Sequence, residues 1–135
     1  MKVRAAEVFA HSEGVLDLGE VERVHDMRVA TRRLRAALEV FEPCFPRKRW
    51  RKALKKVKAL ADALGERRDA DVEIALLEGL VEEAVEADRA ALGKLIDELR
   101  ARQAEANEAL ASYVTPKRLK KLRRRLKKLV KKAGS

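Results

Sequence analysis

The segment Glu20–Phe41, EVERVHDMRVATRRLRAALEVF, decides the fold because its apolar residues recur at alternating steps of three and four. The stripe is formed by Val24, Met27, Thr31, Leu34, Leu38 and Phe41. Only Thr31 is not apolar, and we expect its hydroxyl to bond back to its own helix. A stripe with this period lies on one face of an α-helix that packs against a core. The segment therefore predicts a helix over about 20–41 with one buried face.

The residues that follow predict two more helices. Pro43 and Pro46 end the first helix, because a proline nitrogen cannot donate to the helical ladder. A second helix is expected from Pro46 to about residue 64. Its inward face is predicted to be Trp50, Leu54, Val57, Ala61 and Leu64. Gly65 is placed to cap its C-terminus, and Asp69 to cap the N-terminus of a third helix.

The rest of the chain shows no strand pattern. The third helix is expected to run through Val72, Leu76, Leu80 and Ala84. A fourth helical stretch covers roughly 89–112, and the sequence leaves open whether 69–112 is one helix or two. A short helix is expected within 2–12, and Thr115 is placed to cap a basic last helix over about 116–132. The fold class predicted is all-α, an antiparallel bundle of about four to six helices in one domain, 1–135.

The composition points to an anionic partner. The 135 residues include 32 Lys and Arg against 22 Asp and Glu, which gives a net charge of +10. Residues 113–135 carry 11 basic side chains and no acidic one, so their charge cannot be balanced locally. A strongly basic protein attracts anions or polyanions.

Other features favour a cytoplasmic location. Cys44 is the only cysteine, so the chain cannot form an internal disulfide, which fits a reducing compartment. No apolar run approaches the roughly 18 residues that a transmembrane helix needs. The first residues hold an acid and no apolar block, unlike a signal peptide.

Basic residues form a file beside the buried stripe of the 20–41 helix. His25, Arg28, Arg32 and Arg35 share this side of the helix and span about 15 Å at 1.5 Å per residue. Like-charge neighbours at these spacings each cost a helix roughly 0.2–0.5 kcal/mol. Only Glu39 offers an acidic partner within the file.

A second basic file follows on the next helix, formed by Arg51, Lys55 and Lys58. If the two helices pack antiparallel through the Pro43–Pro46 turn, both files border one groove. Arginine forks bind phosphate oxygens in pairs and lysines supply point charges. The files therefore indicate a groove for a linear polyanion. Two solvated basic faces are the alternative that composition and spacing leave open.

Two runs of residues resemble landmarks of the CHAD family, the conserved histidine α-helical domain. The first is the run 24–35, VHDMRVATRRLR, and the second is the run 64–72, LGERRDADV. They occur in the family's order and are separated by a basic helix. The resemblance covers about residues 1–130.

The resemblance implies a helical protein that binds inorganic polyphosphate in a basic channel and is associated with polyphosphate granules. By position, His25, Arg28, Arg32 and Arg35 match the family's anion-binding helix, and Arg51, Lys55 and Lys58 match its second basic helix. Arg68 matches the landmark arginine, although it is also placed to pair with Asp69 or Asp71 and hold the turn there.

The sequence departs from the family pattern in one respect. Family domains commonly have two similar helical halves, and the second half carries its own histidine-containing basic helix. This chain has no histidine after His25 and resembles the first half. We therefore expect a homodimer whose second subunit supplies the missing wall of the channel, with a truncated chain as the alternative.

Other functions have less support from the sequence. A metal site needs several convergent ligands, and His11 offers the only second imidazole, so neither a metal nor a cofactor is expected. No catalytic constellation or phosphate-binding glycine loop is present, so we expect no enzyme activity. A nucleic-acid-binding protein is the main alternative, but no aromatic residues alternate with the basic ones. Membrane binding by the last helix is disfavoured because that helix lacks Trp and Phe.

Overall fold

The computed structural model describes residues 2–133. Within that range the chain forms five α-helices and one short 3₁₀ helix, η1 (Glu42–Cys44), and contains no strand. The α-helices are α1 (Lys2–Ala10), α2 (Val21–Val40), α3 (Arg47–Glu83), α4 (Glu86–Ala111) and α5 (Pro116–Ala133). The predicted all-α helical bundle is confirmed. No helix within 2–133 is long and apolar enough to cross a membrane.

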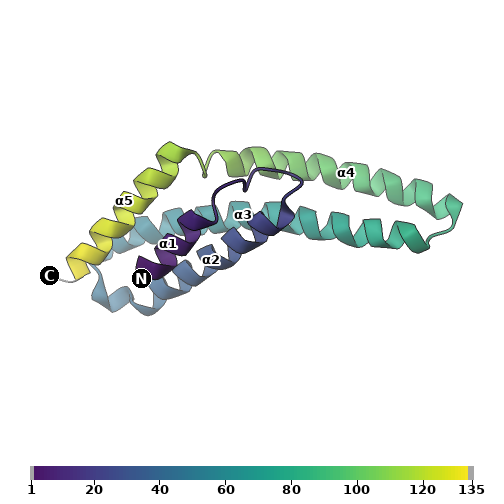
Figure 1. The fold of residues 1–135 in the computed structure, drawn as a ribbon. Helices are drawn as coiled ribbons and strands as arrows, with labels where there is room; N and C mark the ends of the chain where they lie inside the picture. The colour runs from purple at the N-terminus through teal and green to yellow at the C-terminus, as the bar shows by residue number, and fades with distance from the viewer. Residues whose placement is uncertain (1, 134–135) are drawn as a thin grey trace.

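The two longest helices, α3 and α4, form an antiparallel hairpin that runs the length of the molecule (Figure 1). The shorter helices surround one end of it. α1 packs on α2, α2 on α3, α3 on α5 and α5 on α1, so α2 and α5 lie at opposite corners of this end. The far end of the hairpin extends beyond α2 as an arm of two helices (Figure 1).

The core lies where the stripe of α2 meets α3. Val24, Met27, Leu34 and Leu38 are fully buried, as their spacing predicts. Thr31 is buried too, and its hydroxyl donates to the Met27 carbonyl at 2.7 Å, the back-bond expected for it. Phe41 is the exception: it is 48% exposed because α2 ends at Val40, before the stripe is complete.

The predicted helix boundary at Gly65 and Asp69 is wrong. α3 is a single helix of 37 residues that includes both Gly65 and Asp69. Gly65 does not have the positive φ of a C-terminal cap, since Gly14 is the only described glycine with a positive φ. Buried side chains recur without a break on either side of Gly65, among them Leu64 and Ala70. Packing on both sides therefore outweighs the small intrinsic penalty of a glycine inside a helix.

The expected inward face of 69–84 is also wrong. Val72, Leu76 and Leu80 are exposed, and Leu76 is 64% so. The buried residues of this part of α3 are Ala70, Asp71 and Ile74. Near Val72 and Glu73 α3 passes the beginning of α2, and beyond this level it packs on α4. The side turned towards α4 is not the side with the most leucines.

The remaining boundaries follow local chemistry. Ala84 and Val85 are extended and separate α3 from α4, which settles the open question of whether 69–112 is one helix or two. The Thr115 hydroxyl oxygen accepts a hydrogen bond from the Arg118 amide at 3.2 Å, which is the predicted cap of α5. Leu126 and Leu129 of α5 are buried in the same core as the stripe of α2.

The glycines offer a test of the continuous α3. A Cβ at Gly65 would meet nothing nearer than the Arg28 Nε at 3.8 Å, and one at Gly79 would meet nothing. Gly65→Ala and Gly79→Ala should each raise the free energy of unfolding by about 0.5–1 kcal/mol in urea denaturation, since a helical glycine costs that much. Gly14→Ala should lower it, because Gly14 has φ +71° and Arg23 lies 3.0 Å from the added Cβ. Destabilisation by Gly65→Ala alone would contradict a helix that runs through this position.

Candidate anion-binding site

The first basic file lies along one side of α2, next to the buried stripe. His25, Arg28 and Arg35 are half-buried and Arg32 is exposed. Because the stripe faces α3, side chains beside it lie at the edge of the α2–α3 contact and not on the far side of α2.

Two contacts fix how α2 and α3 are aligned. The Trp50 indole nitrogen donates to the Leu38 carbonyl at 2.7 Å near the turn. Further along, the Arg28 guanidinium lies over Gly65. The helices are antiparallel, so between these two levels Arg35 and Arg32 lie beside the stretch of α3 that holds Lys55 and Lys58.

Both files lie on the same side of the α2–α3 contact. On each helix the basic file is rotated by about 100° in the same sense from the buried stripe, at 100° per residue. Because the helices run in opposite directions, equal rotations bring the two files to one side. The position of Arg28 agrees with this arrangement, because its Nε would lie 3.8 Å from a Cβ added at Gly65, and Gly65 continues the file of Arg51, Lys55 and Lys58 along α3.

One hollow at this edge collects residues from both helices. It has a volume of about 380 Å³ and is lined by His25, Arg28, Arg68, Asp69, Val72 and Glu73. His25 and Arg28 come from α2, and the other four come from α3. The predicted residues His25, Arg28 and Arg68 therefore meet in one place, although two carboxylates share it with them.

A second hollow of about 400 Å³ lies nearer the start of α3. Its lining residues are Arg51, Leu54, Lys55, Lys58, Ala59 and Asp62. All three predicted cations of the second file border it. Arg32 and Arg35 line neither hollow, and the Arg35 Nε donates to the Glu39 carboxylate at 3.2 Å, the one acidic partner expected in that file.

The His25 ring has an unusual environment. It borders the first hollow, while its Nδ1 is buried and has no hydrogen-bond partner. A buried polar atom without a partner costs free energy. Arg67 Nη2 and Asp71 Oδ2 share this feature in the interior, but of the three residues only His25 borders the hollow.

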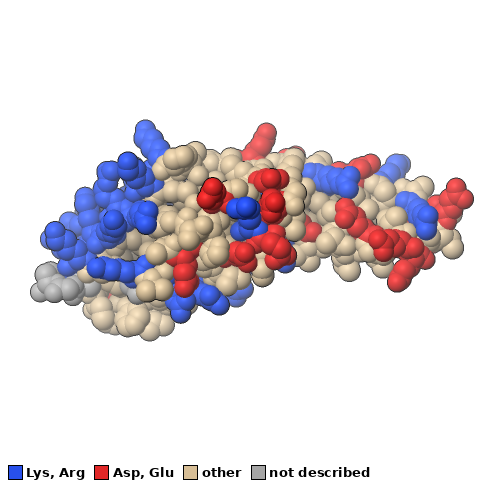
Figure 2. Space-filling model, in the orientation of Figure 1, with Lys and Arg blue, Asp and Glu red and all other residues tan. Residues whose placement is uncertain are grey.

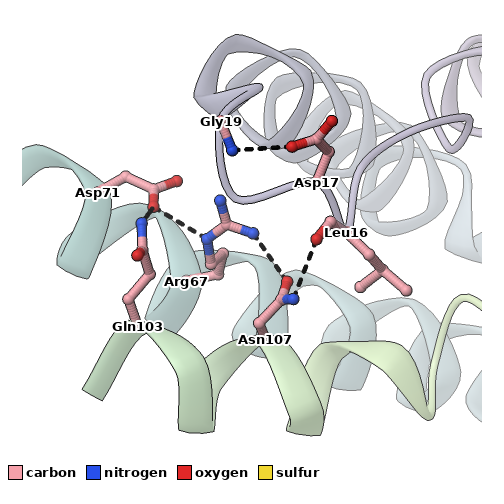
Figure 3. A network of polar contacts seen from close by, with 7 residues as sticks. All are labelled: Leu16, Asp17, Gly19, Arg67, Asp71, Gln103 and Asn107. Atoms are coloured by element: carbon pink, nitrogen blue, oxygen red, sulfur yellow. Dashed lines mark hydrogen bonds and ion pairs between the residues drawn. The ribbon is translucent and has the colours of Figure 1, made fainter. Parts of the chain in front are cut away.

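Behind this hollow, α3 is tied to α4 by a buried polar network (Figure 3). Arg67 is completely buried; its Nε donates to Asp71 at 2.9 Å and its Nη1 to the Asn107 side chain at 2.8 Å. Gln103 donates to the same Asp71 oxygen at 2.6 Å, and Asn107 donates to the Leu16 carbonyl at 3.0 Å. The network joins α3, α4 and the loop that leads into α2.

The network corrects the structural role considered for Arg68. Arg67, not Arg68, makes the pair with Asp71, and consecutive residues of a helix point about 100° apart. Arg67 therefore points to α4 while Arg68 points to the hollow beside α2. The i,i+4 spacing of Arg67 and Asp71 was visible in the sequence, but nothing there indicated that this pair, among many charged pairs, is buried.

The charges of the molecule are separated along its length. Figure 2 shows Lys and Arg gathered at the end where α5 lies, and Asp and Glu over the middle and the arm. Some of these acids pair across the hairpin, as Glu78 does with Arg100 at 3.1 Å. Within residues 2–133, no group of three or more His, Cys, Asp or Glu side chains is arranged to hold a metal ion.

The chain belongs to the CHAD domain family, whose profile matches residues 2–135. This family binds polyphosphate in general, and its domain is not a recognised catalytic fold. No curated protein and no solved structure matched the chain.

The buried Arg67–Asp71 ion pair should contribute more to stability than the exposed ion pairs do. Arg67→Met leaves the Asp71 carboxylate buried without its cationic partner, and we expect it to lower the free energy of unfolding by about 3–5 kcal/mol. Arg100→Met breaks an exposed ion pair and should cost less than about 1 kcal/mol. Urea denaturation of both variants checks this, and equal costs for the two would contradict the structural role of Arg67.

Proposed function

We propose that this protein binds inorganic polyphosphate, without catalysis, in a groove between α2 and α3. In this proposal the polyphosphate lies between two sets of residues. These are His25, Arg28, Arg32 and Arg35 on α2, and Arg51, Lys55, Lys58 and Arg68 on α3. From Arg51 to Arg68 the groove is about 25 Å long, at 1.5 Å per helical residue. Membership of a polyphosphate-binding family supports this proposal.

The observation that carries the proposal is the hollow that Arg28 of α2 shares with Arg68 of α3. Arg28 reaches over Gly65, and it shares a hollow with Arg68. Cations from two consecutive helices thus converge on one strip of surface, although Arg28 and Arg68 are distant from each other in the sequence. Mutual repulsion opposes this arrangement, and a bound polyanion relieves it.

The same surface fits nucleic acid less well. Proteins that bind single strands stack bases on aromatic side chains. Neither hollow is lined by an aromatic residue: Trp50, at the start of α3, is buried and bonded to Leu38. A polymer without bases needs only phosphate contacts, which the arginines and lysines supply.

The location and the lack of activity remain parts of the proposal. A polyphosphate-binding protein would act where the polymer is stored, so we propose the cytoplasm and polyphosphate granules. The groove holds cations and three scattered acids, Asp62, Asp69 and Glu73, and it has no arrangement of groups for hydrolysis.

The expected homodimer also stays a prediction. The exposed stripe Val72, Leu76 and Leu80 supports it, since this stripe begins at the first hollow, where Val72 is a lining residue. A second copy that packed there would add a wall to the groove. The mass of the wild-type protein in solution tests the idea. A protein that stays monomeric while it binds polyphosphate with undiminished affinity contradicts it.

A double variant tests the groove. Arg28→Ala/Arg32→Ala removes two guanidinium contacts, each worth roughly 1.5 kcal/mol or more. Affinity for long-chain polyphosphate should fall on the order of 100-fold at near-physiological salt. Titration of labelled polyphosphate measures this, and duplex DNA at equal phosphate concentration should compete poorly with the wild type.

The matched control is Lys94→Ala/Arg100→Ala on α4, which changes the net charge equally at exposed positions whose side chains line neither hollow. It should bind almost as the wild type does. If both double variants lose the same affinity, or if DNA competes as well as polyphosphate, the groove is not a polyphosphate site.

A further inference from the structure

α5 presents a second basic surface that the groove does not use. Its leucines point inward, and Leu126 and Leu129 are buried in the core. The opposite side of the helix carries a file of exposed cations at steps of four and three. These are Lys117, Lys121, Arg124, Lys128 and Lys131. The file spans about 20 Å at 1.5 Å per residue.

The cations of this surface have no internal partners. Within the described residues 2–133, no carboxylate lies within ion-pair distance of any Lys or Arg from 117 to 131. α5 itself has no acid, and each member of the file has a like charge three or four residues away. Such neighbours repel each other. A helix needed only for its leucines would gain from acids between these cations.

This surface is separate from the α2–α3 groove. α5 contacts α3 and α1, whereas α2 contacts α3 from another side, so the two helices lie at opposite corners of the bundle. The outer face of α5 points away from the core that lies between them. A straight polymer in the groove therefore does not run along the α5 file.

We propose that the outer face of α5 is a second binding surface for polyphosphate, so that one protein holds two separate stretches of polymer. The inference rests on the proposed function of the groove. With two surfaces facing different directions, the protein links polyphosphate chains to each other. It is thus a cross-linker of the polymer and not only a ligand of it.

The features of α5 favour polyphosphate over other polyanions. The helix has no aromatic residue on which a base could stack, which disfavours single-stranded nucleic acid. Its apolar face is already buried in the protein, so it has none to insert into a lipid surface. Evenly spaced point charges match a simple chain of phosphates.

A bridging assay tests the inference with the full chain. Beads that carry long-chain polyphosphate are incubated with protein, washed, and offered fluorescent polyphosphate. The α5 variant is Lys121→Gln/Arg124→Gln/Lys128→Gln, all at exposed positions. The control is Arg89→Gln/Lys94→Gln/Arg100→Gln on α4, which removes the same charge at exposed positions that line neither hollow. Circular dichroism and thermal midpoints confirm that both variants fold.

The wild type and the α4 control should capture the fluorescent chain. The α5 variant should stay on the beads through its groove but capture at least 10-fold less. Undiminished bridging by the α5 variant, equal losses in both variants, or equal capture of fluorescent DNA would overturn the inference. Failure of the proposed function shows separately, as undiminished bead binding when Arg28→Ala/Arg32→Ala is added to the α5 variant.

Discussion

The apolar contact between α2 and the first half of α3 is the constraint on which the site depends. Val24, Met27, Leu34 and Leu38 are fully buried there. Each such side chain contributes about 1.5–3 kcal/mol on burial. A like-charge pair on a helix costs roughly 0.2–0.5 kcal/mol. The free energy gained by burial therefore outweighs the repulsion several-fold, so the fold tolerates two rows of cations beside its core.

Acidic residues interrupt the row of cations on α3. Along α3, Asp62 follows Lys58 and Asp69 follows Arg68, so the α3 side of the groove is interrupted. Arg28 of α2 lies level with this interruption, beside Gly65. The two helices thus complement each other, because α2 supplies positive charge where α3 supplies least. The Arg67 network then holds α4 and the loop before α2 in place, which leaves Arg68 free to face the groove.

The sequence was sufficient to predict the elements that have a single strong periodic signal. The stripe of α2, the back-bond of Thr31, the burial of Trp50 and the cap at Thr115 all follow from local chemistry. The boundary at Gly65 could not be predicted, because glycine ends some helices and is tolerated in others, and only packing on both sides decides. The exposure of Leu76 could not be predicted either, because its environment depends on where a different helix, α2, begins. The burial of Asp71 could be predicted only from the tertiary structure, in which Arg67 and Gln103 donate hydrogen bonds to its carboxylate.

Arginine side-chain NMR during titration with polyphosphate tests the groove most directly, since each guanidinium gives its own Nε–Hε signal. If the groove binds the polymer, the signals of Arg28, Arg32 and Arg68 shift and become protected from solvent exchange as binding saturates. The signals of Arg89 and Arg100 on α4, which line neither hollow, stay in place. Saturated binding with the Arg28, Arg32 and Arg68 signals unmoved would contradict the account.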